Sequence, residues 1–455
     1  MSLRTSRRWL PLAVLLAVVS AGCATTPPGS PAASASEPAV TPVPSVSITP
    51  GPSLDATPTA PPVTAPSATQ ELIEFLLTLV EEEPANGEAH RDLGLALLQR
   101  VRETADPSLY PRAEEAFLAA RELLPDDPLV LVGLGALELG RHEFAAALRT
   151  GMAALDAYPG YPTARGVIVD SLVELGRYKE AFAAAESLAA DSPDLASYAR
   201  LSYAHELRGD LAAALEAMEL ASSAPGLAPE NTAYVLALVG QLRRLTGDPD
   251  GATAAYEQAL TLVPDHAPSL AGLGRLAVGR GDLEEARARY ERAAAVVPLP
   301  EYVIALGEVL EVAGDTDAAK DQFELARALI TLSQANGVVV DVDLALFEAD
   351  HGDAATALRL AEAGYAATPT VRAADARAWA LHRLGRDEEA APFSVEALRL
   401  GSRDPLLLFH AGAIAAALGR ADEARQHLEA ALAADPGFTP AGAAEARSIL
   451  DDLGS

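Results

Sequence analysis

The stretch APSLAGLGRLAVGRGDLEEARARYERAAAVVP, residues 267–298, decides the fold. Gly281 can adopt the left-handed backbone conformation that satisfies the last carbonyls of a helix, so it ends a first helix. Pro298 stops a second helix because it lacks the N–H that would continue the hydrogen-bond ladder. Ala286 and Ala293 lie between these two residues at helical spacing, and they are small enough to let neighbouring helices approach closely. The stretch therefore predicts two antiparallel helices joined by a short turn.

The same pattern recurs along the chain. Successive turn glycines are 36, 33, 38, 34, 33, 38, 33 and 34 residues apart, which indicates a repeat with a period near 34. These glycines are Gly140, Gly176, Gly209, Gly247, Gly281, Gly314, Gly352, Gly385 and Gly419. An alanine follows each glycine by five residues: Ala145, Ala181, Ala214, Ala252, Ala286, Ala319, Ala357, Ala390 and Ala424. Aspartates that can cap the next helix directly follow five of the glycines, at Asp210, Asp248, Asp282, Asp315 and Asp353.

The pattern resembles the tetratricopeptide repeat, whose signature places hold Leu270, Leu273, Gly274, Ala277 and Tyr290 in this unit. The resemblance implies an all-α fold of tandem helix-turn-helix repeats that form a right-handed superhelical solenoid. We expect a leading helix and about ten units over residues 70–438, followed by a C-terminal capping helix over 439–455. An insertion of roughly seven residues interrupts the first unit between Gln99 and Arg112. The units are expected to begin near Gly87, Asp126, Pro162, Leu195, Ala233, Ala267, Pro300, Val338, Val371 and Pro405.

The first 23 residues have the pattern of a secretory signal. Three arginines precede an apolar run that begins at Trp9 and is too short to span a membrane. The run ends in Ser20-Ala21-Gly22-Cys23, which resembles the lipobox of bacterial lipoproteins, although that family usually has Leu where this chain has Ser20. The resemblance implies lipidation of Cys23 and anchoring at the extracytoplasmic face of the cell membrane or the outer membrane. An ordinary secretory signal with an incidental cysteine is the alternative.

Residues 24–69 are expected to form a disordered linker. The segment has 12 prolines among many Ala, Ser and Thr residues, with Glu37 and Asp55 as its only charges. Repeated X-Pro pairs favour extended backbone over helix, and the apolar content is too low to form a core. The segment could therefore hold a folded domain clear of a membrane.

Composition and charge exclude several classes of function. Half of the residues are hydrophobic but only 5% are aromatic, as in a helical protein rich in Ala and Leu. From residue 70 onward, 62 acidic residues outnumber 31 basic ones, so the domain should not bind nucleic acid and should prefer a neutral or basic partner. One cysteine excludes a disulfide framework and a cysteine-based metal site. We expect no metal, no cofactor and no enzymatic activity, because the chain has neither a phosphate-binding loop nor two histidines at helical spacing.

The resemblance also implies a groove, because the first helices of stacked repeats line the concave face in this family. Carried over unit by unit, its groove positions fall on Leu95, Leu98, Val130, Leu134, Tyr203, Gln241, Arg244, Arg275, Glu308, Trp379, His382 and Phe409. Trp379 is a candidate anchor for a partner, with packing between units as the alternative. The main hypothesis is a membrane-anchored extracytoplasmic scaffold that binds a protein or peptide in a cell-envelope assembly. The alternative is binding of envelope polysaccharide, or docking onto an enzyme that synthesises or exports it.

Overall fold

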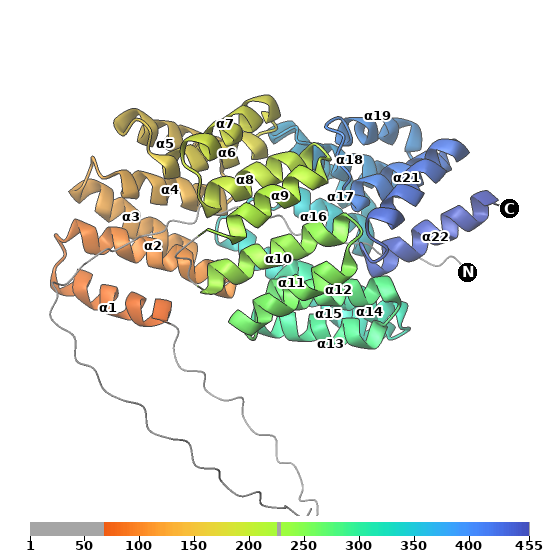
Figure 1. Cartoon of the computed structure of the whole chain (residues 1–455), viewed down its shortest axis with the longest axis horizontal. Coiled ribbons are helices and arrows are strands. Elements are labelled where there is room, and N and C mark those ends of the chain that lie inside the picture. Colours follow the sequence, from red (N-terminus) through yellow and green to blue (C-terminus); the bar gives the residue numbers. More distant parts are fainter. Residues whose placement is uncertain (1–67, 225–228, 455) are drawn as a thin grey trace, which may run out of the picture.

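The computed structural model describes residues 68–224 and 229–454, which form 22 helices and no strand (Figure 1). The expected all-α fold is confirmed, whereas the expectations for the signal sequence, Cys23 and the linker up to residue 67 lie outside the described residues. The leading helix α1 (Ala68–Glu82) begins two residues earlier than the expected start at residue 70. The C-terminal helix α22 (Pro440–Gly454) closes the stack.

Ten helix pairs lie between α1 and α22, and they correspond to the ten expected units. The pairs are α2 (Gly87–Thr104) with α3 (Leu109–Leu123), α4 (Pro128–Gly140) with α5 (Phe144–Ala157), α6 (Pro162–Glu174) with α7 (Tyr178–Asp191), α8 (Leu195–Leu207) with α9 (Leu211–Ser222), α10 (Pro229–Leu245) with α11 (Pro249–Leu262), α12 (Ala267–Arg280) with α13 (Leu283–Val296), α14 (Pro300–Val312) with α15 (Thr316–Ala335), α16 (Asp341–His351) with α17 (Ala354–Ala367), α18 (Val371–Arg383) with α19 (Asp387–Ala397), and α20 (Pro405–Ala417) with α21 (Ala421–Ala434).

The turn aspartates cap the second helices as the sequence predicts. In each case the carboxylate accepts a hydrogen bond from the backbone N–H three residues further on, which satisfies one of the unpaired donors at the start of a helix. The five caps are Asp210, Asp248, Asp282, Asp315 and Asp353.

One turn is displaced from its expected position. Seven of the nine turn glycines have positive φ, but Gly140 lies inside α4, and His142 takes the left-handed conformation with φ 62°. Consequently Ala147 is fully buried in the place expected for Ala145, which is exposed. Counted from His142, the next turn glycine, Gly176, is one ordinary period away. The spacing of 36 residues between Gly140 and Gly176 therefore arises because His142 takes the left-handed turn position that glycine takes in seven other turns.

Glycines in neighbouring first helices make room for bulky residues of the second helices. The Tyr256 ring of α11 lies between Gly240 of α10 and Gly272 of α12, and it is 2% exposed. A Cβ atom at Gly240 or Gly272 would lie 2.6 or 2.4 Å from the ring. The Tyr256 ring therefore stabilises the stacking of two units only because neither position carries a side chain.

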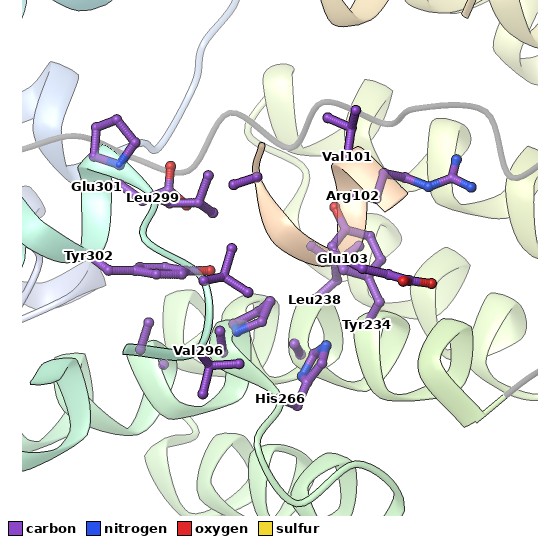
Figure 2. A pocket seen from close by; sticks show the side chains of 18 of the residues that line it. Val101, Arg102, Glu103, Tyr234, Leu238, His266, Val296, Leu299, Glu301 and Tyr302 are labelled. Atoms are coloured by element: carbon purple, nitrogen blue, oxygen red, sulfur yellow. The ribbon is translucent and has the colours of Figure 1, made fainter. Parts of the chain in front are cut away.

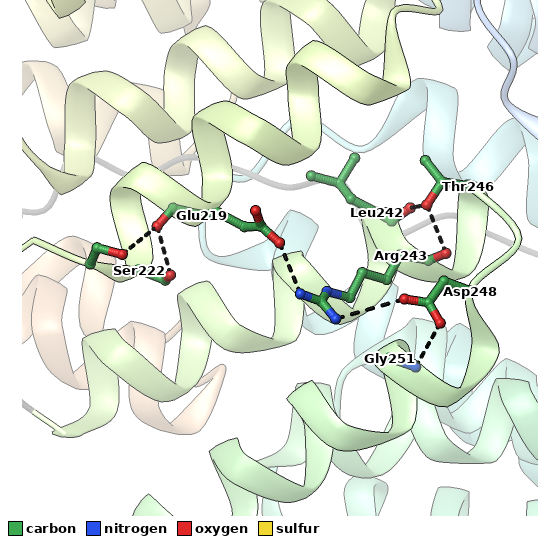
Figure 3. A network of polar contacts seen from close by, with 8 residues as sticks. Glu219, Ser222, Leu242, Arg243, Thr246, Asp248 and Gly251 are labelled. Atoms are coloured by element: carbon green, nitrogen blue, oxygen red, sulfur yellow. Dashed lines mark hydrogen bonds and ion pairs between the residues drawn. The ribbon is translucent and has the colours of Figure 1, made fainter.

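Polar contacts on the surface also join successive units. Figure 3 shows Arg243 of α10 between Glu219 of α9, at 2.9 Å, and Asp248 at the start of α11. Asp248 itself accepts from the N–H of Gly251 at 2.9 Å. Arg243 is partly exposed, so these contacts align the helices more than they stabilise the fold.

The superhelix completes a turn, and its second turn rests on the first. The Tyr178 hydroxyl accepts from the N–H of Val371 at 3.0 Å, across 193 residues. The N–H of Val339 donates to the carbonyl oxygen of Arg141 at 3.0 Å, and Nδ1 of His142 lies 2.7 Å from the carbonyl oxygen of Val339. We call these inter-turn contacts, together with those described next, the seam.

Two further contacts continue the seam toward the C-terminus. Gly209 (φ 73°) lies so close to Gly401 that a Cβ atom at Gly209 would be 2.1 Å from the carbonyl oxygen of Gly401. Arg244 forms an ion pair with Asp435 across 191 residues, and both side chains are buried. Because the side-chain contacts of the seam join residues 191 to 197 positions apart, roughly six repeats make one turn. The seam therefore holds the first and second turns of the superhelix together.

Candidate functional site

A cavity of about 640 Å³ lies inside the superhelix. Its walls come mainly from first helices of the pairs, with residues of α2, α10, α12 and α14 facing one another across it (Figure 2). Arg102, Glu103 and Tyr234 lie toward one side in this view, and Glu301 and Tyr302 lie toward the other. A cavity of this size, lined mostly by apolar and aromatic groups with a few polar ones, is typical of a binding site.

The largest departures from the repeat meet at this cavity. The longest described helices are α15 with 20 residues, α2 with 18 and α10 with 17, whereas most of the others have 11 to 14. Their extra residues carry the insertion in the first unit and the two spacings of 38 residues. The extra turn of α2 supplies Arg102 and Glu103, the start of α10 supplies Glu230 and Tyr234, and the end of α15 supplies Ser333. Three separate insertions therefore build one cavity.

Tyrosine is enriched in the lining. Five of the chain's 11 tyrosines line the cavity: Tyr110, Tyr234, Tyr256, Tyr290 and Tyr302. Desolvation, with a further contribution from Glu301, raises the pKa of Tyr234 to about 12 and that of Tyr302 well above its usual value. Both hydroxyls therefore stay protonated at neutral pH and can donate a hydrogen bond to a ligand.

The charges in the lining are close to balance, unlike those of the domain as a whole. Four arginines face five carboxylates there, namely Arg102, Arg244, Arg275 and Arg372 against Glu103, Glu230, Asp265, Glu301 and Asp343. Arg372 lies 2.5 Å from Asp343, and Glu103 lies 3.1 Å from Arg100. Burial lowers the pKa of His266 to about 4, so this imidazole is neutral. The cavity therefore offers hydrogen-bond donors and acceptors without a strong field of either sign.

Three of the predicted groove residues, Gln241, Arg244 and Arg275, line this cavity. The amino-terminal set lies elsewhere: Leu98, Val130 and Leu134 are buried in the core between α2, α3 and α4, and Leu95 packs against the same core. Tyr203 is half-buried against the cluster around Tyr178. The expected apolar start of the groove is therefore core, because the first helices of adjacent units pack together there.

The late units do not expose the aromatic anchor that the sequence suggested. Trp379 is fully buried, its indole N–H donates to Asp350 at 2.9 Å, and its ring stacks on His410 at 4.4 Å between ring centroids. Phe409 is also fully buried, with its ring 5.9 Å from that of Trp379. The alternative, packing between units, describes Trp379 correctly.

Glu308 and His382 have local partners instead of a groove position. Glu308 is fully buried, and its carboxylate lies 3.5 Å from Nε2 of His351. Nδ1 of His382 lies 2.5 Å from a carboxylate oxygen of Asp387, across the turn between α18 and α19. Both residues therefore hold adjacent helices together in this structure.

Four residues of the lining were not predicted from the sequence: Arg102, Glu103, Tyr234 and Tyr302. Transfer of family positions assumes units of equal length, so it cannot reach residues in extra helical turns. The signal was present in the two spacings of 38 and in the insertion after Gln99. These departures from the period lie next to the residues that line the cavity.

The described ranges, residues 68–224 and 229–454, also bear on membrane-spanning helices and metal sites. Within these ranges no helix combines the length and the hydrophobicity that crossing a membrane requires. No cluster of three or more histidine, cysteine or acidic side chains there could hold a metal ion.

Comparison with known proteins gives matches to repeat families and to solved structures. Residues 167–228, 244–308 and 407–438 match models described as tetratricopeptide repeat. No curated protein matches the chain. A tetratricopeptide repeat protein from Parabacteroides merdae is 17% identical over 57% of this chain and 99% of its own, with a TM-score of 0.33.

Two structures of MamA are similar over a shorter part of the chain. MamA 41-end from Desulfovibrio magneticus is 21% identical over 38% of this chain and 94% of its own, with a TM-score of 0.27. A second MamA structure is 20% identical over 35% of this chain and 92% of its own, with a TM-score of 0.29. The fold is identified by the repeated sequence pattern, the ten helix pairs and the three matched stretches. On these grounds the chain is a tetratricopeptide repeat protein.

Proposed function

We propose that this protein is a non-catalytic scaffold, anchored by lipid at the extracytoplasmic face of a membrane, that binds a segment of a partner protein in its interior cavity. The observation that carries the proposal is the meeting of three insertions at one cavity. Tetratricopeptide repeats generally mediate binding between proteins, and a superhelix offers an enclosed surface for this. Extra turns that serve only stability would have no reason to converge on the same interior space.

The chemistry of the lining limits the partner. Tyrosine rings and paired charges suit a neutral chain with backbone groups to be hydrogen-bonded. The acidic exterior favours the approach of a neutral or basic protein, and this preference weakens as salt screens the charges. Carbohydrate also binds to tyrosine rings and polar groups, so an envelope polysaccharide is the second candidate.

Photo-crosslinking tests the cavity. A photoreactive amino acid in place of Leu238, in the cavity wall, should crosslink to a partner protein in intact cells, and mass spectrometry would identify the adduct. The matched control is Val395 on α19, which is 66% exposed and lies outside the lining. Equal adducts at both positions, or adducts of glycan alone at Leu238, would reject the protein-binding proposal.

The anchor rests on residues 1–23 alone. Radioactive palmitate should label the wild-type chain but not a Cys23→Ala variant, and the variant should leave the membrane fraction. An unlabelled wild type would reject lipidation while leaving the cavity proposal intact.

A further inference from the structure

We propose that the outer face of α1 is a second docking surface, which binds an amphipathic helix of a partner protein that carries lysine or arginine along its edges. α1 lies at one end of the stack of repeats, at the edge of the body in Figure 1. Its residues do not line the cavity, so this inference does not rest on the proposed function.

The sequence of α1 has the pattern of the second helix of a repeat pair. A proline follows it, as one follows α3, α11 and α13: Pro84, Pro125, Pro264 and Pro298. Eight residues before each of these prolines lies a large buried residue: Leu76, Phe117, Tyr256 and Tyr290. Leu76 and Ile73 pack in the core that α1 shares with α2, the first helix of the next pair. α1 is the first of the described helices, so no described first helix pairs with it.

Two positions of a second helix face the first helix of the same pair. One is the alanine twelve residues before the proline, which is fully buried in α3, α11 and α13: Ala113, Ala252 and Ala286. Its counterpart in α9 is Ala214, whose carbonyl oxygen accepts a hydrogen bond at 2.7 Å from the hydroxyl of Ser202 on α8. The other position lies three residues further on, where Ala255 of α11 packs in one core cluster with Leu242 of α10.

In α1 both positions hold large apolar side chains that are exposed. Leu72 takes the place of the buried alanine and is 46% exposed, and Phe75 takes the second place and is 62% exposed. Leu79 lies on the same face, one turn beyond Phe75, and is partly buried. We call these three residues the α1 stripe. Because the end of a stack of repeats usually has a polar outer face, an apolar stripe here indicates that another helix covers it, as a first helix does in the ten pairs.

Glutamates border the α1 stripe. Residues 68–89 carry six glutamates, all exposed, and no lysine or arginine. Glu71 lies one turn before Phe75, and Glu82 lies three residues after Leu79, so both carboxylates flank the apolar side chains. A helix that places apolar residues on the stripe and basic residues beside these carboxylates therefore matches the surface in both shape and charge.

Three other occupants fit less well. A second copy of the chain would bring the glutamates of α1 against those of another α1, or against α22, which is also acidic. An anionic bilayer would repel the same glutamates. The sequence from 27 to 67 has no proline-free stretch longer than six residues, whereas the first helices of the ten pairs have 11 to 18 residues. The helix that covers the α1 stripe therefore comes from another protein.

Fluorescence anisotropy with a designed peptide tests the surface. The probe is a labelled helix of about 20 residues with leucine and alanine along one face and lysine elsewhere. The protein is the purified full chain with Cys23→Ala, which should bind the probe. Phe75→Ser should weaken this binding at least about 10-fold, because it removes the most exposed residue of the stripe. Val395→Ser on α19 is the matched control, since it removes an apolar side chain of similar exposure, 66%, and should leave the affinity unchanged.

A second variant and a second peptide separate apolar contact from charge. Leu72→Ser should weaken binding as Phe75→Ser does. A peptide with glutamate in place of every lysine should bind at least about 10-fold more weakly than the lysine peptide. Equal binding of the lysine peptide by Phe75→Ser and the unaltered surface would overturn the inference, because the peptide would then bind the acidic exterior in general. Equal binding of the two peptides would overturn the preference for a basic helix.

Two measurements without peptide report the other occupants. Sedimentation of the same chain should show a monomer, and vesicles of phosphatidylcholine with phosphatidylglycerol should not bind it, because Cys23→Ala removes the proposed site of lipidation. A dimer that Phe75→Ser dissociates, or vesicle binding that Phe75→Ser abolishes, would overturn the inference. Crosslinking from Leu238 in the cavity tests the proposed function separately, since none of these substitutions alters the lining.

Discussion

At the scale of single residues, Gly240 and Gly272 leave the space that the Tyr256 ring fills between two units. The predicted consequence is that Gly272→Ala lowers the free energy of unfolding by about 1–2 kcal/mol, because a new Cβ atom would overlap the ring. Chemical denaturation measures this, and Gly454→Ala is the control, since nothing lies near that position. An unchanged denaturation midpoint for Gly272→Ala would show that the ring moves aside freely.

Glu206 makes stability depend on pH. Desolvation, and then the nearby Asp404, raise its pKa to about 7, and Gln241 donates a hydrogen bond to it at 3.2 Å. Between pH 4.5 and 7 the folded state holds a proton that the unfolded state has lost, so the contribution of this group to stability falls as the pH rises.

Glu206→Gln should therefore stabilise the protein by about 1–2 kcal/mol at pH 8, after allowance for the partial exposure of the group, and by much less at pH 5. Thermal unfolding at the two pH values gives the comparison. Glu216→Gln on the exposed face of α9 is the control. A gain of equal size at both pH values would contradict the assignment.

At the scale of elements, the helix pairs could be predicted from the repeated sequence pattern, but the displaced turn at His142 and the surroundings of Trp379 could not. Glycine at the turn, aspartate after it and alanine five residues on recur at fixed spacing, so all ten helix pairs could be predicted. The displaced turn at His142 was missed because only glycine was expected in the left-handed region. Packing of Trp379 between units could be named only as an alternative to an exposed anchor, because a repeat position gives a helix face but not what packs against it.

Capping should be separable from packing at this scale. Asp282→Ala removes the acceptor for the N–H of Glu285 at the start of α13, and it should lower the free energy of unfolding by about 1 kcal/mol. Asp282→Asn keeps an oxygen acceptor at the same place, so it should cost less. Urea denaturation of the three chains tests this, and equal losses for Ala and Asn would show that the charge, not the cap, matters.

At the scale of the whole molecule, contacts between successive turns hold the second turn of the superhelix against the first. No repeat pattern predicts them, because they join residues about six periods apart and involve loops that differ from unit to unit. Arg244 belongs to both features, since it lines the cavity and pairs with Asp435 in the seam. Binding in the cavity and closure of the seam should therefore be coupled.

Asp435→Asn tests the seam. Removing one partner of a buried ion pair leaves Arg244 with an uncompensated charge, which typically costs 3–5 kcal/mol, so we expect a loss of about 3 kcal/mol. Hydrogen exchange should rise around residues 435–437 and at the end of α10, where the two turns meet. The exposed pair on α13 provides the control, and Glu291→Gln should change stability by less than about 0.5 kcal/mol. The double variant Arg244→Met with Asp435→Leu should recover most of the loss, because it removes both buried charges together. Faster exchange spread evenly over all repeats would mean that Asp435 stabilises the fold generally and does not hold the two turns together.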